Sequence, residues 1–274
     1  MLIAQLSDPH ILAAGQLLYR RFDSAAALRD AVSRIGKIKP HPDCVVVSGD
    51  LVNHGAAAEY AQLRDLLAPL TMPVFLMPGN HDERGALATA FAGDDRADKL
   101  RQAFTGAPLC CQRVDLAPAD GEVLTLLLLD TVIPGREGGE VGAAQLDWLE
   151  ANCPADAPTM LFLHHPPFST GIAGMDAITC SGAGLLADWL AAHRNVIALS
   201  SGHVHRTIFT RFAGIAACIA PSTALQIALD LGGKAAALSW TPEPGGFLLH
   251  HWHEQSLVTH LVPSAAVEVV RYGA

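Results

Sequence analysis

Histidines and carboxylates recur in short polar blocks that follow apolar runs. The block SSGHVHRT (200–207) holds His203 and His205, and the block SDPH (7–10) holds Asp8 and His10 with the same two-residue spacing. Residues two apart share a face only in an extended segment or a turn, so both side chains of each pair can reach one ligand. Imidazole and carboxylate groups without thiolates suit Mn, Fe, Co or Zn. These two blocks therefore indicate a site for a divalent metal ion.

Three further blocks have the same character. They are SGDLVNHG (48–55) with Asp50, PGNHDE (78–83) with Asn80 and His81, and LFLHHPPF (161–168) with His164 and His165. Seven of the thirteen histidines fall in the five blocks, although chance would scatter them over helix faces and loops. The clustering predicts that one site collects them.

The elements that precede the blocks are predicted to be β-strands. Nearly continuous apolar runs of strand length lie at 2–7, 44–48, 74–77, 123–129, 159–163 and 196–200. Such runs are typical of parallel strands that are covered on both faces. Helical patterns lie between them at 24–38, with Ser24 as the expected N-cap, and at 56–70, 143–153 and 184–193. This alternation predicts a layered α/β domain, and ligands bind at the carboxyl ends of the strands in such sheets.

The chain changes character after residue 206. Short strand-like segments such as GFLLHHWH (246–253) are separated by glycine and proline turns, with no helical pattern between them. We expect one domain over residues 1–274, with a catalytic core at 1–221 and a β-rich C-terminal extension at 222–274. Exposed edge strands in the extension would invite contacts between subunits, so a homo-oligomer is expected.

The complete pattern, D-x-H, G-D, G-N-H-D, H and G-H-x-H, resembles the calcineurin-like metallophosphoesterase superfamily from Met1 to about Pro221. Within it, MLIAQLSDPH, LLYRRFD and HHPPF look most similar to class III cyclic-nucleotide phosphodiesterases and bacterial glycerophosphodiesterases. The resemblance implies a layered β-sandwich flanked by helices.

The resemblance also implies a binuclear metal centre. One ion would be held by Asp8, His10, Asp50 and His205, and the other by Asp50, Asn80, His164 and His203. Asp50 can bridge because a carboxylate has two oxygens, and a shared anionic ligand offsets the repulsion between two ions about 4 Å apart. His81 would lie over the substrate as the group that stabilises charge or donates a proton.

The activity that follows is hydrolysis of small phosphodiesters, either 3',5'-cyclic nucleotides such as cyclic AMP or glycerophosphodiesters. A hydroxide that bridges the two ions would attack phosphorus in line. A phosphomonoesterase or a nuclease of the same superfamily is the alternative among enzymes, and a non-catalytic metal-binding scaffold is the alternative outside them.

Several residues outside the ligand set are also of interest. Tyr19 and Phe168 are candidate substrate contacts, and the glycine-rich stretch 169–184 is a candidate pocket wall. His165 is expected to be structural. The histidines of HHWH (250–253) have no associated aspartate block, so a strand surface or subunit interface is expected there rather than a third metal site.

Composition limits the partners. The formal net charge of −9 argues against binding to a nucleic-acid duplex, since phosphate contacts dominate such binding. Apolar runs such as LLLL (126–129) are far shorter than the about 20 residues of a membrane span. The six cysteines show no C-x-x-C spacing, and no signal peptide is evident. A cytoplasmic location is expected.

Overall fold

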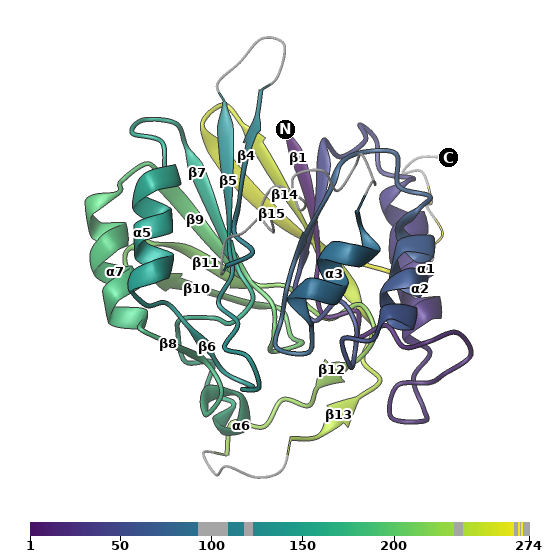
Figure 1. Cartoon of the computed structure of the whole chain (residues 1–274). Helices are drawn as coiled ribbons and strands as arrows, with labels where there is room; N and C mark the ends of the chain where they lie inside the picture. Colours follow the sequence, from purple (N-terminus) through teal and green to yellow (C-terminus); the bar gives the residue numbers. More distant parts are fainter. Residues whose placement is uncertain (93–108, 118–122, 233–237, 266–267, 269, 271–274) are drawn as a thin grey trace.

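Two mixed β-sheets pack face to face, and helices cover the outer face of each sheet in the computed structural model (Figure 1). The structure describes residues 1–92, 109–117, 123–232, 238–265, 268 and 270. The arrangement has four layers, in the order helices, sheet, sheet, helices. The predicted class, a layered α/β sandwich flanked by helices, is confirmed.

The first sheet has the strand order β15-β14-β1-β2-β3. Its parallel part consists of β1 (Leu2–Leu6), β2 (Cys44–Ser48) and β3 (Val74–Met77). The C-terminal hairpin of β14 (Gly246–His253) and β15 (Ser256–Pro263) joins it through antiparallel pairing of β14 with β1. The C-terminal strands are thus part of a core sheet.

The second sheet has the order β10-β11-β9-β7-β5-β4. Its strands are β4 (Gln112–Leu116), β5 (Leu124–Leu129), β7 (Thr159–Leu163), β9 (Val196–Ser201), β10 (Ile208–Phe212) and β11 (Ile215–Ile219). The four strands from β11 to β5 are parallel, and β10 and β4 are antiparallel edges. The parallel strands of the second sheet and strands β1 and β2 of the first lie inside their sheets, whereas the parallel strand β3 forms an edge of the first sheet. The side chains of these parallel strands are largely buried, as expected where both faces of a strand are covered.

Alternate side chains of each inner strand enter different layers. Ile3 and Val46 belong to the core between the sheets, together with Phe162 of the second sheet. Their neighbours Ala4 and Val47 pack outward against helices. The predicted runs were apolar without alternation because both faces of these strands are buried.

The helices occupy the outer layers. α1 (Ser24–Ile35), α2 (Ala57–Leu67) and α3 (Arg84–Ala90) pack on the first sheet, and α5 (Ala143–Asn152) and α7 (Ala183–Ala192) pack on the second. In the described part of the chain, no helix is long and apolar enough to cross a membrane.

The expected cap of the first helix was wrong by one residue. Asp23 is the N-cap, and its carboxylate accepts a hydrogen bond of 2.8 Å from the Ala26 amide. Ser24 instead is buried and donates to the His10 carbonyl at 3.1 Å. The helix start therefore packs beneath the loop that follows β1.

Two small strand pairs and a short helix lie at the carboxyl ends of the main strands. They are β6 (Gly139–Glu140) with β8 (Cys180–Ser181), β12 (Gln226–Ile227) with β13 (Trp240–Thr241), and α6 (Ala173–Asp176). In Figure 1 all of them lie along the lower edge of the sandwich. They add loops to the edge at which the polar blocks meet.

Candidate metal centre and active site

The carboxyl ends of five parallel strands deliver the polar blocks to one place. In the first sheet, β1 leads to Asp8 and His10, β2 to Asp50, and β3 to Asn80. In the second sheet, β7 leads directly to His164 and His165, and β9 to His203 and His205. Because the two sheets pack face to face, these loops converge.

Asp8, His10, Asp50 and His205 form one buried group whose ligand atoms all lie within 4.8 Å of one another. His205 Nε2 lies 3.0 Å from His10 Nε2 and 3.3 Å from Asp8 Oδ1. His10 Nε2 lies 3.5 Å from Asp50 Oδ2. Four potential metal-ligand atoms are thus close enough together to bind one ion.

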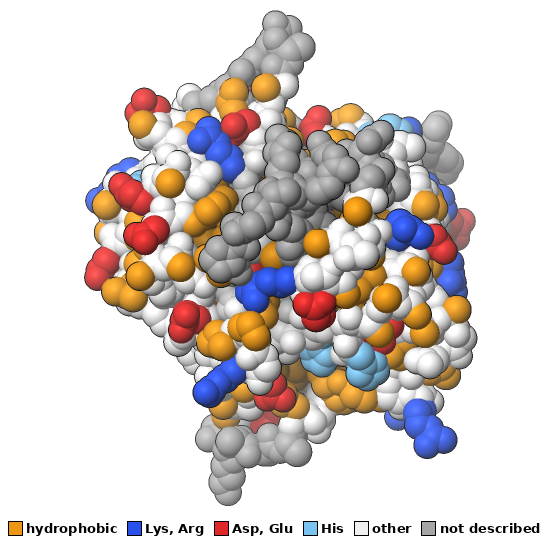
Figure 2. All heavy atoms as spheres, in the orientation of Figure 1, with side chains coloured by type: hydrophobic (Ala, Val, Ile, Leu, Met, Phe, Trp, Pro, Cys, Tyr) orange, Lys and Arg blue, Asp and Glu red, His pale blue; other side chains and the backbone are white. Residues whose placement is uncertain are grey.

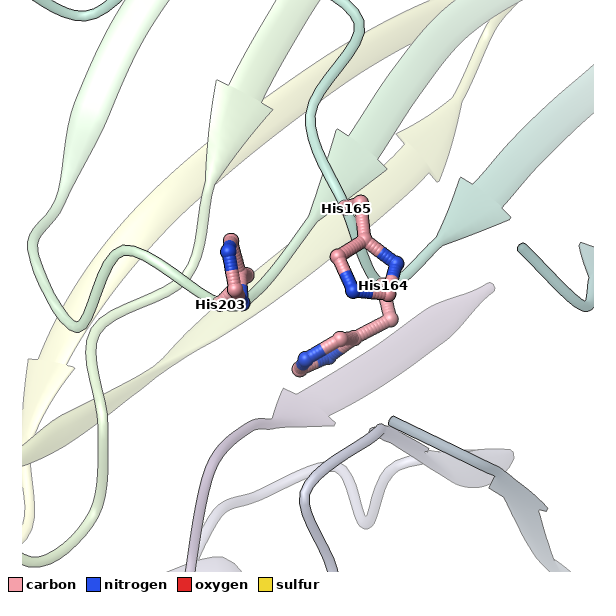
Figure 3. Close-up of side chains that lie close together, drawn as sticks. All are labelled: His164, His165 and His203. Atoms are coloured by element: carbon pink, nitrogen blue, oxygen red, sulfur yellow. The ribbon is translucent and has the colours of Figure 1, made fainter. Parts of the chain in front are cut away.

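A second group adjoins the first. His164 Nε2 lies 3.4 Å from Asp50 Oδ1 and 3.3 Å from Asn80 Oδ1. The rings of His164 and His203 are 5.2 Å apart, and Figure 3 shows them in adjacent loops after β7 and β9. The two oxygens of Asp50 therefore face different groups, as a bridging ligand requires.

His165 is the third imidazole in Figure 3, and one of its ring nitrogens lies within 4.8 Å of ligand atoms of His164 and His203. Both of its nitrogens are engaged elsewhere. Nδ1 is 2.9 Å from Thr131 Oγ1, and Nε2 donates to the Glu137 carbonyl at 3.1 Å. These contacts favour a structural role.

Carbonyl groups fix the orientation of three imidazoles. His164 Nδ1 donates to the Ser48 carbonyl at 2.8 Å, His203 Nε2 to the Ile178 carbonyl at 3.0 Å, and His205 Nδ1 to the Leu225 carbonyl at 3.1 Å. Each bond selects a tautomer whose other nitrogen keeps a lone pair. This outer hydrogen bond is typical of metal-binding histidines.

The charges of the site suit a cation. Burial lowers the pKa of His10 to about 3 and that of His203 to about 4, so both are neutral donors. Burial would raise the pKa of Asp50, but His164 and His10 hold it well below its usual range. Burial alone would lower the pKa of His164, yet Asp50 raises it to about 9, so this position attracts positive charge. The donor set fits divalent ions.

Five of these residues have left-handed backbone conformations. The φ angles are 50° for Asp8, 44° for His10, 48° for Asp50, 70° for His203 and 51° for His205. Each such residue costs on the order of 1–3 kcal/mol, and this strain concentrates at functional sites. Aspartate and histidine adopt this conformation more often than most residues, but it remains a minority conformation for both, so the residue types alone do not predict it.

The loop after β3 is held tightly against Asp50. A Cβ at Gly79 would lie 2.2 Å from the Asp50 amide, so only glycine fits there. Asp82 accepts hydrogen bonds from the amides of Gly79 and Leu51 at 2.8 and 3.0 Å and from the Tyr60 hydroxyl at 3.0 Å. Asp82 therefore supports the turns after β2 and β3.

A cavity of about 210 Å³ opens onto both groups. Its lining comprises His10, Tyr19, Asp50, Asn80, His81, Glu137, Met175, Ile178, His203, His205, Ile227, Leu238 and Trp240. Figure 2 shows histidine and hydrophobic side chains adjoining each other in the lower centre of the visible face. Of the described residues that line the cavity, none is a lysine or arginine.

The predicted substrate contacts lie in different places. Tyr19 lines the cavity and stacks on Trp240, with ring centroids 5.1 Å apart. His81 also lines it, and its Nδ1 donates to the Asn53 carbonyl at 2.9 Å. Phe168 instead packs in the hydrophobic clusters beside the second sheet and is not part of the lining described above.

Part of the lining could not be found from the sequence. Met175 and Ile178 belong to the stretch 169–184, which the sequence predicts as a candidate pocket wall, but Ile227 and Trp240 lie in a region without a motif. The antiparallel pair β12–β13 places them, and the Trp240 ring lies 5.4 Å from that of His205. Their positions in the sequence bear no regular spacing to the polar blocks that hold the predicted metal ligands.

The histidines of HHWH lie away from this site. His250 is buried and contacts Thr259 and Gln5, while His251 and His253 stack with ring centroids 5.6 Å apart. His54 is also separate, since its exposed ring pairs with Glu59 at 2.8 Å. His251 and His253 lie on the outer face of β14, as expected for a strand surface, whereas His250 is buried because its ring packs against Phe162 of the second sheet.

Comparison with known proteins identifies the family. Residues 1–207 match the calcineurin-like phosphoesterase family. The chain belongs to this family. The expected family membership is confirmed, and the two groups of ligands are suited to holding two metal ions.

Curated relatives cover most of the chain. A protein from Arcobacter nitrofigilis named "Probable glycerophosphodiester phosphodiesterase GpdQ" is 34% identical over 95% of this chain and 92% of its own length. A "Probable cyclic nucleotide phosphodiesterase" from Rhodopseudomonas palustris is 37% identical over 82% and 79%. The 3',5'-cyclic adenosine monophosphate phosphodiesterase CpdA of Escherichia coli is 30% identical over 82% and 76%.

Solved structures show the same fold. A dimetal phosphatase from Danio rerio superposes with a TM-score of 0.69, covers 97% of this chain and 96% of its own, and is 17% identical. At this identity the likeness shows only the fold.

Proposed function

We propose that this protein is a binuclear metal-dependent phosphodiesterase that hydrolyses small phosphodiesters. The observation that carries the proposal is the position of Asp50, whose two oxygens face two adjoining groups of buried ligands beside an open cavity. The names of the relatives, which include glycerophosphodiester and cyclic-nucleotide phosphodiesterases, support this class of substrate.

We infer the ligand sets from the two groups. One ion is held by Asp8, His10, Asp50 and His205, and the other by Asp50, Asn80, His164 and His203. Mn, Fe, Co and Zn all suit these donors. When bound, the ions supply Lewis acidity and a hydroxide nucleophile near neutral pH.

The remaining chemistry is assigned to His81 and the loop that carries it. The Asn53 carbonyl accepts from Nδ1, which leaves Nε2 free at the cavity. A protonated Nε2 can stabilise charge on the phosphoryl oxygens and donate a proton to the leaving alkoxide. The His81 amide donates to Asp50 Oδ1 at 2.9 Å, so the bridging carboxylate and His81 are held in a fixed relation.

The lining favours a diester over a monoester. A monoester is largely dianionic at neutral pH, whereas a diester carries one charge and a second organic substituent. Ile227, Leu238 and Trp240 supply apolar lining to the cavity, and the Trp240 ring lies 5.4 Å from that of His205. Such a lining can receive the second substituent, because burial of its apolar surface is favourable.

The same lining favours a nucleoside substituent over glycerol. Tyr19 is 52% exposed and stacks on Trp240 at an interplanar angle of 26°. Stacking of a base on an aromatic side chain contributes about 1–3 kcal/mol. We therefore propose cyclic nucleotides as the preferred substrates, with glycerophosphodiesters as the second class.

Hydrolysis of bis(p-nitrophenyl) phosphate tests the proposal. Protein stripped with a chelator is assayed with and without Mn²⁺, beside p-nitrophenyl phosphate. Mn²⁺-dependent cleavage that favours the diester supports it, and preference for the monoester would identify a phosphatase. In the same assay, His81→Ala should lower turnover, because His81 is assigned to the chemistry. His193→Ala is its matched control, because His193 packs on Trp189 away from the cavity.

We also infer the assembly and location of the protein. The single domain 1–274 is supported by the pairing of β14 with β1. A homo-oligomer is supported by Phe209, Val258 and Leu261, which are 60%, 47% and 49% exposed on the edge strands β10 and β15. The six free cysteines agree with a reducing cytoplasm. Light scattering of the purified protein tests the assembly, and a monomer at micromolar concentration would contradict it.

A further inference from the structure

A continuous chain of hydrogen bonds crosses the interior from strand β15 to the metal centre. Its members, in spatial order, are Thr259, His250, Gln5, Ser48, Ser7 and Asp8. The successive contacts measure 2.8, 2.9, 2.9, 2.9 and 2.5 Å. All members except the half-buried Thr259 are fully buried.

The direction of every bond is fixed by groups that can only accept. The Ser201 carbonyl accepts from Gln5 Nε2 at 3.2 Å, which sets the orientation of the Gln5 amide. Gln5 Oε1 must then accept from His250 Nε2, so His250 Nδ1 accepts from the Thr259 hydroxyl.

The hydrogen bonds at the Asp8 end of the chain must run in the same direction as those at the Thr259 end. The Asp8 carboxylate accepts from the Ser7 hydroxyl, so Ser7 Oγ accepts from Ser48 and Ser48 Oγ accepts from Gln5 Nε2. All five donors therefore point toward Asp8. Hydrogen bonds aligned in this way polarise and strengthen one another in a buried environment.

The last bond of the chain holds one oxygen of Asp8 and leaves the other directed at the site. Ser7 binds Oδ2, while Oδ1 lies 3.3 Å from His205 Nε2. Gly202 makes room for this arrangement, because a Cβ there would lie 2.1 Å from Ser7 Oγ. The His203 amide adds bonds of 3.1 and 3.0 Å to the two oxygens.

We propose that Thr259, His250, Gln5, Ser48 and Ser7 form a positioning relay that fixes the Asp8 carboxylate for metal binding. The relay ties the C-terminal hairpin β14–β15 to a metal centre built from the first 205 residues. Fixing the carboxylate in advance removes ordering cost from metal binding, since partners of metal ligands hold them in the productive orientation. The inference rests on the ligand role of Asp8 in the proposed function.

Metal affinity separates positioning from a merely structural role. Metal-free protein is titrated with Mn²⁺ by calorimetry, and the thermal stability of the metal-free form is measured in parallel. Asp8→Ala identifies the ion that depends on Asp8. Ser7→Ala should weaken the same ion about 10- to 100-fold, as the loss of such partners does elsewhere. The other ion should keep its affinity within about threefold, because Asp8 lies outside its ligand set.

Two further variants complete the test. Thr259→Val removes the first donor of the relay and keeps the size and shape of the side chain. It should weaken binding of the same ion by a smaller factor than Ser7→Ala does. Ser201→Ala is the matched control: Ser201 is buried beside the relay, but its hydroxyl lies 3.4 Å from the Cys218 carbonyl and is not a member. It should leave both metal affinities unchanged.

The outcomes are distinct. Wild-type affinity for both ions in Ser7→Ala and Thr259→Val, with lowered stability alone, would show a structural network and overturn the relay. If Ser7→Ala does not fold, Thr259→Val decides, since an unchanged affinity in that variant has the same meaning. Wild-type protein that binds two ions but cleaves no phosphate ester would overturn the proposed function and leave the relay standing.

Discussion

His250 should make the stability of this protein fall at acidic pH. The side chain is fully buried between the sheets, with Gln5 and Thr259 as its hydrogen-bond partners. Burial lowers its pKa to about 3, compared with about 6.5 in an unfolded chain. Between these values the unfolded state binds one more proton than the folded state. The contribution of neutral His250 is therefore complete above pH of about 6.5 and decreases as the pH falls toward about 3.

The magnitude follows from the two pKa values. Each pH unit below the unfolded value costs about 1.4 kcal/mol, so lowering the pH from 8 to 5 should cost about 2 kcal/mol through this residue. His250→Gln lacks a titrating group and should lack this loss. The difference in unfolding free energy between wild type and variant should therefore shrink by about 2 kcal/mol.

Urea unfolding of the metal-free proteins at pH 8 and pH 5 measures the difference. His251→Gln is the matched control, because it removes the neighbouring half-buried imidazole from the opposite face of β14. Water screens the His251 ring, so the difference in unfolding free energy between wild type and His251→Gln should change much less between pH 8 and pH 5. If the gap between wild type and His250→Gln is the same at both pH values, His250 is not held as a buried neutral imidazole, and the tautomer assigned to the relay fails with it.

Four further predictions concern the site. Asn80→Ala should remove one of the two ions and lower turnover about 100-fold or more, and full activity with two bound ions would rule out Asn80 as a ligand. His81→Ala should lower kcat by about 10²- to 10⁴-fold while both ions stay bound, and loss of metal instead would make His81 a ligand. Trp240→Ala should lower kcat/KM for cyclic AMP about 5- to 150-fold and spare a glycerophosphodiester, whereas equal losses would contradict base stacking. Chelation should lower the melting temperature, because an ion at about 100 times its Kd adds about 2.7 kcal/mol of stability, and an unchanged temperature would contradict binding to the folded state.

The sequence by itself determined the strands and the positions of the polar blocks. Runs such as 44–48 and 159–163 are almost entirely apolar because both faces of these strands are buried, and their predicted ends coincide with the observed ones. Because the carboxyl ends of parallel strands meet at one edge, the residues that follow them had to converge. The local pattern was sufficient to predict the candidate metal-ligand positions, because a residue that directly follows a parallel strand lies at the carboxyl edge of the sheet.

The tertiary structure alone decided which residues surround and orient the ligands. Trp240 reaches the cavity only because β13 pairs with β12, and Gln5 reaches His250 only because β14 pairs with β1. In sequence, Gln5 lies within an apolar run and His250 within an isolated histidine cluster, so neither is linked to Asp8 by any spacing. Contacts between residues 245 positions apart depend on how strands order and sheets pack, and local propensity contains no information on either.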